Sequence, residues 1–224
     1  PAFYSNGAPA LVVSASLAGR LYAFKGGSAQ PATIALASGE VYQGSAALKT
    51  GTVLKPLGGL FGVPALGAGS PAHHSTPGGD ARLFFGNPAS GVFAGAVATF
   101  TADAAANAAG DQFGAAVFGG GFSGSTVSVS LINGPQPDVV LSSAKLGGAV
   151  PAKLFIIDGT KTNVSADVPT TADVVYTLPP AWRGAANAST SIRDIDGDGF
   201  ADIAVGEQQG NWTPLYDGRV LVLW

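Results

Sequence analysis

Residues 194–202 read D-I-D-G-D-G-F-A-D and carry four aspartates in nine positions, in a chain with only 14 acidic residues. Asp194, Asp196 and Asp198 stand at alternate positions, and Asp202 follows four residues later. Carboxylates this close together repel one another strongly unless a cation lies between them. Ca²⁺ takes six to eight oxygen ligands at about 2.3–2.6 Å, so acids converging from a short loop suit it. The spacing therefore predicts a calcium site, and the alternative is an acidic turn without metal.

Two further residues complete the predicted calcium loop. The backbone carbonyl of Phe200 stands where a main-chain ligand is expected, and Gly199 permits the positive φ that such a turn needs. An EF-hand loop begins in the same way but requires flanking helices and a bidentate acid at its twelfth position. Here the twelfth position is Val205 and the flanking runs are β-rich, so the pattern disfavours an EF-hand.

The composition limits which partners the chain can have. Of its 224 residues, 46% are hydrophobic, which is enough for a large core, and 11% are charged. Disordered chains have low hydrophobicity and high net charge, so this composition excludes them. The net charge of −3 offers no basic surface for nucleic acid. No apolar run approaches the roughly 20 residues of a membrane helix, so we expect no direct membrane insertion. The chain lacks cysteine, which excludes disulfides, thiol catalysis and Cys-ligated zinc. It begins Pro-Ala-Phe without a Met or a visible signal peptide, which favours a processed or excised segment.

A weak internal repeat predicts how the chain is organised. Four segments each hold a β-rich run, a turn of small residues and a second β-rich run, at 8–27, 80–100, 136–158 and 200–224. We also expect further strands at 32–38 and 173–179, and a linker at 101–110. A period near 60 residues suits four-stranded antiparallel units. The approximate units are 1–50, 55–105, 108–180 and 185–224.

Short motifs within these units resemble the FG-GAP repeat, which forms the blades of integrin α-subunit-type β-propellers. Phe-Gly occurs within 60–69 and again within 111–121, and "ASTSIRDID" holds the same place in the fourth unit. Gly86, Asn87 and Pro88 approximate the Gly-Ala-Pro element, and the D-x-D-x-D-G-x-x-D loop completes the pattern.

The resemblance implies an all-β propeller of four-stranded antiparallel blades that holds calcium in its acidic loops. Calcium is carried over to the fourth unit alone, because the second unit retains only Asp80 and the third only Asn133 and Asp138. Such propellers have about seven blades, and this chain holds about four, of which the outer two look incomplete. We therefore expect other chains, or the rest of a longer polypeptide, to complete the propeller.

The resemblance also implies a non-enzymatic, calcium-binding module for adhesion, recognition or assembly, with a protein or a glycan as its ligand. The expected location is extracellular, at the cell surface or periplasmic. The alternative is an accessory or catalytic domain of a secreted carbohydrate- or lipid-active enzyme. The chain's histidines are confined to His73 and His74, and its glutamates to Glu40 and Glu207, and these form no recognisable catalytic set.

Aromatic and asparagine residues in loop-like contexts supply the remaining candidates. Trp182, Trp212 and Tyr216 could stack on sugars in a lectin-like role, or the tryptophans could pack between blades. Trp224 ends a β-rich run and is expected in the core. Three Asn-x-Ser/Thr sequons, which are either glycosylated or coincidental, begin at Asn163, Asn187 and Asn211.

Overall fold

The structure is a computed structural model of the chain. It describes all residues other than 1–8, 27–34, 72–78, 88, 102–110, 120–136, 146–150, 163–165, 168–170, 181, 184–185, 187, 193, 198–199, 208 and 211–217.

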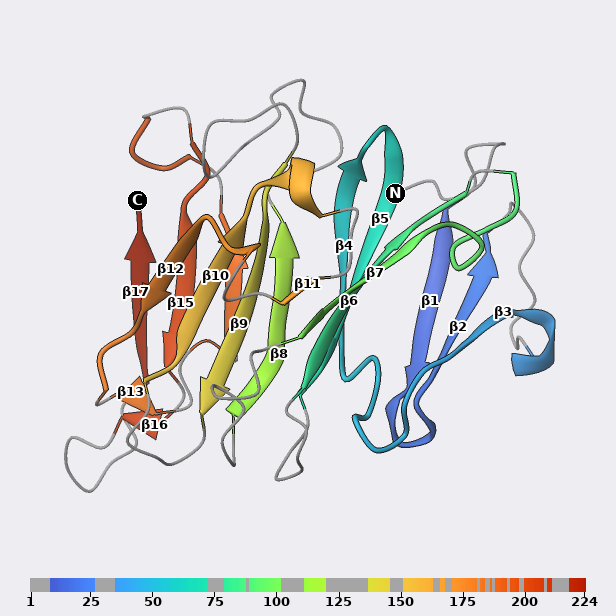
Figure 1. Cartoon of the computed structure of the whole chain (residues 1–224), viewed down its shortest axis with the longest axis horizontal. Coiled ribbons are helices and arrows are strands. Elements are labelled where there is room, and N and C mark those ends of the chain that lie inside the picture. Colours follow the sequence, from blue (N-terminus) through green and yellow to red (C-terminus); the bar gives the residue numbers. More distant parts are fainter. Residues whose placement is uncertain are drawn as a thin grey trace.

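Four antiparallel sheets form the body of the molecule (Figure 1). The first sheet contains β1 (Ala10–Ala15), β2 (Arg20–Lys25) and β3 (Glu40–Gln43). The second contains β4 (Val53–Leu60), β5 (Val63–Ser70), β6 (Asp80–Phe85) and β7 (Val97–Thr101), and β11 (Ala166–Asp167) pairs in parallel with β7. The third contains β8 (Asp111–Gly119), β9 (Val139–Lys145), β10 (Lys153–Ile157) and β12 (Val174–Thr177). The fourth contains β14 (Ala188–Ser191), β15 (Ile203–Glu207) and β17 (Arg219–Leu223).

Shorter elements connect these strands. The strands β13 (Trp182–Arg183) and β16 (Gln209–Gly210) form a two-stranded sheet. Single turns of 3₁₀ helix occur at Ser16–Ala18, Leu36–Ser38 and Gly159–Lys161. Among the described residues, no helix is long and apolar enough to cross a membrane.

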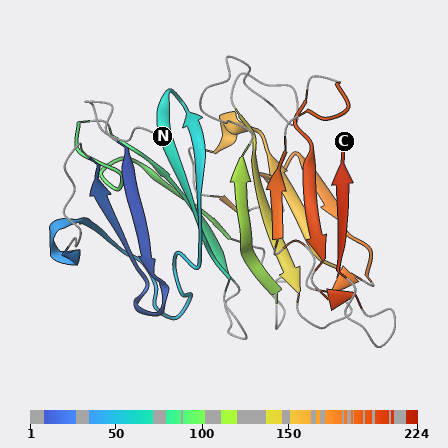
Figure 2. The same cartoon turned by 180° about the vertical axis from the view of Figure 1, so that it is seen from behind.

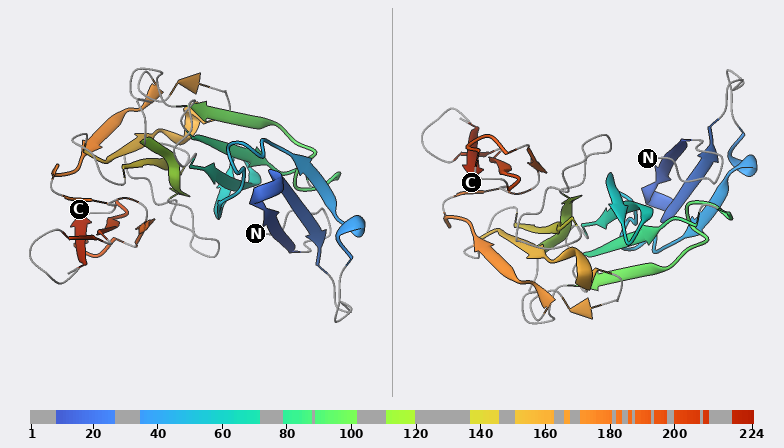
Figure 3. Two further views of the ribbon diagram at one scale, coloured as in Figure 1. Left: turned by 90° about the horizontal axis from the view of Figure 1, so that it is seen from below. Right: turned by 90° about the horizontal axis from the view of Figure 1, so that it is seen from above.

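The four sheets spread like spokes around an arch, with the first and fourth sheets at its two ends (Figure 3). Alternate residues of a strand point to opposite faces, so each inner sheet can bury apolar side chains on both sides. One buried cluster lies between the first and second sheets and includes Leu21 and Phe84. A second, between the second and third sheets, includes Phe100 and Phe113. Ile203 belongs to the third cluster, between the third and fourth sheets.

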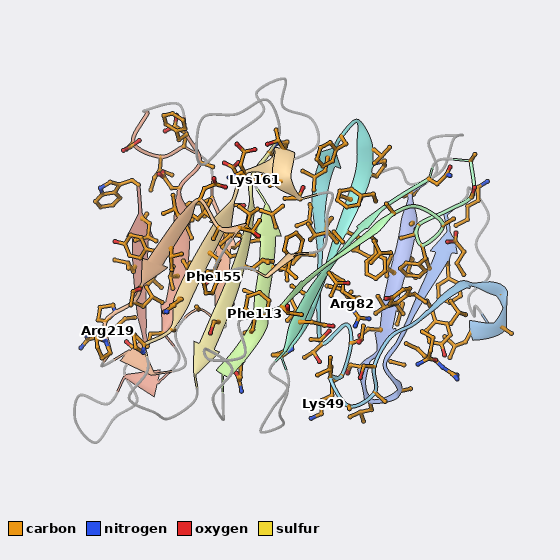
Figure 4. All side chains as sticks on the ribbon, viewed as in Figure 1. Lys49, Arg82, Phe113, Phe155, Lys161 and Arg219 are labelled. Carbon is orange, nitrogen blue, oxygen red and sulfur yellow. The ribbon has the colours of Figure 1, made fainter. Side chains whose placement is uncertain are left out.

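Inner strands of neighbouring sheets also contact each other directly. Figure 2 shows the molecule from behind, where β14 lies beside β8. The Ser191 hydroxyl at the end of β14 donates a hydrogen bond of 2.9 Å to the carbonyl of Gly119 at the end of β8. In the core of the third sheet, the rings of Phe113 and Phe155 meet edge to face with centroids 5.9 Å apart (Figure 4). The Ser191 hydrogen bond ties the end of β14, three residues before Asp194, to β8 of the third sheet.

The all-β architecture of blade-like sheets confirms the predicted fold class, and the strand expected within 173–179 is present as β12. The strand expected at 32–38 is wrong, because Leu36–Ser38 form a 3₁₀ turn and the strand is β3, which follows it. The Ser38 hydroxyl donates to the Ala35 carbonyl at 2.7 Å and closes that turn. Residues 102–110 of the expected linker lie outside the described part.

The second sheet has more strands than the four of the predicted unit. Residues 80–100 supply β6 and β7, which continue the sheet from β5, and β4 lies on the other side of β5. The pair Phe61-Gly62 is the two-residue turn between β4 and β5, whereas Phe113-Gly114 lies inside β8. Gly86 and Asn87 directly follow β6, and Pro88 lies outside the described residues.

Trp224, expected in the core, is 78% exposed. It follows the edge strand β17 on a face that no described part of the chain covers.

Candidate metal centre

The acidic loop connects the first and second strands of the fourth sheet, where the sequence predicted it. The last ladder pair is Ser191 with Ile203, and the Ile192 N–H extends the pairing by donating to the Asp202 carbonyl at 2.7 Å. The base of the loop is therefore closed by backbone hydrogen bonds. This closure places Asp202 directly opposite the residues that lead into the acidic run.

Three carboxylates converge in this loop. Asp194, Asp196 and Asp202 each present one oxygen, and these oxygens all lie within 4.8 Å of one another. Two oxygens on opposite sides of a calcium ion, each at about 2.3–2.6 Å from it, would be about 4.6–5.2 Å apart. The three groups therefore have the separation needed to ligate one ion. Among the described residues, this is the cluster of acids that could hold a metal.

Backbone hydrogen bonds hold two of these carboxylates in place. The Asp202 side chain accepts the Ile195 N–H at 2.7 Å through Oδ2, and Asp202 is only 2% exposed. The Asp194 side chain accepts the Gly197 N–H at 2.6 Å through Oδ1. A carboxylate has about four lone-pair sites, so each group retains capacity for a cation after accepting one hydrogen bond.

Burial differs strongly across the three carboxylates. Asp202 is buried, Asp194 is half-buried and Asp196 is exposed. A buried carboxylate that keeps its charge needs compensation, which the Ile195 N–H supplies only in part. A cation bound between the three oxygens would supply the remainder. The exposed side of Asp196 leaves that position open to solvent, from which an ion could enter.

Other predicted residues are only partly placed by the structure. The Phe200 backbone is described and its side chain is exposed, whereas Asp198 and Gly199 lie outside the described residues. Trp182 is in β13, but its side chain is not described. The remaining candidates also lie outside the described part of the chain: Trp212, Tyr216, Asn163, Asn187, Asn211, His73 and His74. Their roles stay predictions.

Sequence reasoning missed several features that organise the loop. The sequence predicted a positive φ at Gly199, which lies outside the described residues. Gly197, two residues earlier, has a φ of +86°. The Asp-Gly pair at 196–197 was the available signal, because this dipeptide is typical of tight turns. The backbone donors at Ile195 and Gly197 had no sequence signal, since any residue except proline supplies an N–H.

Asp80, the acid retained in the second unit, is held by an ion pair. It begins β6, is 3% exposed and pairs with the Arg82 guanidinium at 2.5 Å. Arg82 also donates to the Tyr42 hydroxyl at 3.0 Å, which joins the second sheet to the first (Figure 4). The spacing Asp-x-Arg was the signal, because residues two apart share one face of a strand.

The corresponding aspartate of the third sheet is also buried. Asp138 directly precedes β9, as Asp202 precedes β15, and no part of it is exposed. Its Oδ1 accepts the Gly159 N–H at 3.3 Å. Asn133, the other residue retained in the third unit, lies outside the described residues. The third sheet thus keeps the aspartate at the start of its second strand, and a backbone N–H donates a hydrogen bond to that carboxylate.

The sheets stand around an arch, and in one of them a loop of acids joins the first two strands. Sheets arranged in this way are blades of a β-propeller. Residues 186–223 match the FG-GAP repeat family, which confirms the resemblance for β14, β15, β17 and the acidic loop. This part of the chain is therefore similar to an FG-GAP repeat. The chain matches none of the curated proteins.

Proposed function

We propose that the chain is a non-enzymatic, calcium-binding propeller module that acts in recognition, adhesion or assembly. The observation that carries this proposal is the convergence of Asp194, Asp196 and Asp202 within 4.8 Å, inside the segment that matches the FG-GAP repeat. Asp198 and the Phe200 carbonyl would supply further oxygens, which brings the ligand set toward the number that calcium takes. The ion would brace the loop and would perform no chemical step.

Calcium would act through the connection between β14 and β15. It would join the buried carboxylate of Asp202, at the start of β15, to the exposed carboxylate of Asp196 near the loop tip. Neutralising these charges removes the repulsion that otherwise opens the loop. The rigid loop would then present Ile195 and Phe200, whose side chains are exposed, in a fixed arrangement.

A location outside the cytosol suits this site, whether extracellular, at the cell surface or periplasmic. Extracellular calcium modules bind with dissociation constants of about 10⁻⁴–10⁻³ M, which matches the calcium available there. The ligand would be a protein or a glycan held by loops at one end of the strands. Trp182, Trp212 and Tyr216 are the aromatic candidates for stacking on a sugar.

Isothermal titration with CaCl₂ tests the metal assignment. We expect one calcium per chain, and we expect the Asp196→Asn variant to bind at least tenfold more weakly because one charged ligand is lost. Asp173→Asn is the matched control, since Asp173 lies next to β12 of the third sheet, outside the acidic loop. Equal binding by the Asp196 variant and the unaltered chain would overturn the proposed site.

The recognition role needs a separate experiment. A glycan array probed with the calcium-loaded chain, alongside Trp182→Ala and Trp212→Ala variants, tests the sugar ligand. Binding that is lost in either variant, while the calcium titration is unchanged, would support stacking on that tryptophan. Calcium binding without glycan binding would favour a protein ligand.

A further inference from the structure

The acidic loop follows a short strand at the edge of its sheet. Strand β14 has four residues, and in the fourth sheet β15 separates it from β17. Among the described residues its backbone ladder is with β15 alone, and Ser191 with Ile203 is the pair nearest the loop. The end of an edge strand opens easily, because one side of its backbone has no neighbouring strand. The segment that leads to Asp194 therefore needs a further contact to stay in place.

A hydrogen bond to the third sheet supplies a contact at that point. The Ser191 hydroxyl, at the end of β14, donates to the Gly119 carbonyl, at the end of β8, at 2.9 Å. Figure 2 shows β14 beside β8. Ser191 is only 4% exposed, so little water can reach its hydroxyl in place of the carbonyl. The start of the loop is thus tied to a different sheet from the one that carries it.

The other end of the loop is held from within the fourth sheet. The Asp202 carbonyl accepts the Ile192 N–H, and its carboxylate accepts the Ile195 N–H, each at 2.7 Å. Asp202 is itself buried at the start of β15. On the β14 side, Ser191 is the last buried residue described before Asp194. The two ends of the loop are therefore fixed by different contacts, and the Ser191 hydrogen bond is the one at the end that leads into the acids.

Gly119 lies in a packed corner of the third sheet. It ends β8 and pairs with Val139, the first residue of β9. A Cβ added at Gly119 would lie 3.1 Å from the Asp138 carbonyl oxygen, so the two strand ends approach each other closely. The buried Asp138 carboxylate accepts the Gly159 N–H at 3.3 Å, which joins this corner to the turn that follows β10. Ser191 thus connects the acidic loop to a part of the third sheet that its own contacts hold in place.

We propose that Ser191 is a positioning residue of the calcium loop, and that it couples calcium binding in the fourth sheet to the end of β8 in the third. This inference rests on the calcium site proposed above. Holding the end of β14 before the ion arrives reduces the conformational entropy that the loop loses on binding. The coupling is reciprocal, as thermodynamic linkage requires. Since the hydrogen bond from Ser191 favours calcium binding, bound calcium in turn favours the hydrogen bond to Gly119.

Calcium titration of two serine variants tests the positioning role. Ser191→Ala should bind calcium about three- to fivefold more weakly, the factor expected for one net hydrogen bond. Ser189→Ala is the matched control, because Ser189 lies on the same face of β14 and is also buried. The Ser189 hydroxyl has no hydrogen-bond partner among the described residues, so its removal should leave the calcium affinity unchanged. Equal affinity in the two variants would overturn the inference.

The NMR chemical shift of the Gly119 carbonyl carbon tests the coupling to the third sheet. This shift responds to the hydrogen bond that the carbonyl accepts, and Gly119 lies outside the predicted calcium ligands. Saturating calcium should move the shift in the unaltered chain and in Ser189→Ala, but not in Ser191→Ala. A serine that only stabilised the fold would leave the Gly119 shift independent of calcium. The same shift with and without calcium in the unaltered chain would therefore overturn the coupling.

The titrations also separate this inference from the proposed function. An unaltered chain that binds no calcium would overturn both. Calcium binding by the unaltered chain, with Ser191→Ala as tight as Ser189→Ala, would overturn the inference alone. Ser191→Thr keeps a hydroxyl at the same position and should bind calcium as tightly as the unaltered chain, and binding as weak as that of Ser191→Ala would contradict the role of the hydroxyl. Circular dichroism in EGTA confirms that each variant is folded, so that weaker binding does not come from unfolding.

Discussion

The second and fourth sheets join their first two strands in opposite ways. In the second sheet, Leu60 pairs with Val63, and only Phe61 and Gly62 lie between β4 and β5. Both have positive φ, +51° and +74°, as a type I′ hairpin turn requires. In the fourth sheet, the acidic loop lies between β14 and β15. The same antiparallel pairing thus accepts a minimal turn or a loop able to hold a metal, so the strands position the site without determining its presence.

The two sheets also differ in which groups contact the carboxylate of a buried aspartate. Asp80 and Asp202 are 3% and 2% exposed. Asp80 is compensated from within the protein by the Arg82 guanidinium. Asp202 accepts a backbone N–H and shares its surroundings with two more aspartates. The second sheet therefore has its cation built in, whereas we propose that the fourth takes one from solvent.

The largest expected effect comes from removing the built-in cation. Arg82→Met leaves the buried Asp80 without its partner, and breaking such a pair costs about 3–5 kcal/mol of unfolding free energy. Urea denaturation measures this loss, which calcium should not restore. The double variant Asp80→Asn with Arg82→Met should recover most of the stability. An Arg82→Met variant as stable as the unaltered chain would show that the ion pair does not compensate Asp80.

Replacing the acidic loop by a minimal turn tests the other half of the comparison. With residues 193–201 exchanged for Asn-Gly, the fourth sheet acquires the type of connection that the second sheet has. We expect a folded chain that has lost its calcium-dependent stabilisation, which is about 2.7 kcal/mol at a hundredfold excess of calcium over the dissociation constant. Thermal melts with and without calcium measure it. A chimera whose melting temperature still rises with calcium would place the ion elsewhere.

Two glycines give a matched pair with intermediate effects. Gly62 and Gly197 both have positive φ, and at each position an added Cβ would meet no atom within 4 Å. Alanine at either site therefore introduces only backbone strain, of about 1–2 kcal/mol. We expect Gly62→Ala to lower the unfolding free energy equally with and without calcium. Gly197→Ala should instead weaken calcium binding, as measured by titration, and equal calcium affinity in both variants would contradict this.

The smallest effect concerns an exposed carboxylate of the third sheet. Burial raises the pKa of Asp173, but hydrogen bonds from the Lys161 ammonium and the Asp158 N–H outweigh it and hold the pKa below its ordinary value of 3.8. The group thus stabilises the fold above that value, and the contribution disappears as pH falls through the lowered pKa. Because the pair is partly exposed, Lys161→Ala should cost about 0.2–1 kcal/mol at neutral pH. Stability measured by urea denaturation across this pH range should show the variant and the unaltered chain converging once Asp173 is protonated.

The convergence of the acids in residues 194–202 could be predicted because its determinants are local. Nine consecutive residues supply the acids and the turn, so their spacing alone shows that the carboxylates can converge. The strand β4 could not be predicted in this way. It contains Pro56, Gly58 and Gly59, which are residues that strands disfavour, and only its pairing with β5 makes this segment a strand.

The sequence by itself determined that the chain is all-β, that it repeats, and that one loop gathers acids with a spacing that suits a hard cation. Only the tertiary structure decided which aspartate is neutralised by an arginine, which is capped by a backbone N–H, and which sheet faces remain outward. The physical reason is that burial and charge compensation depend on strands far apart in the chain. Tyr42 contacts Arg82 across 40 residues and Ser191 contacts Gly119 across 72, and such pairings leave no local pattern.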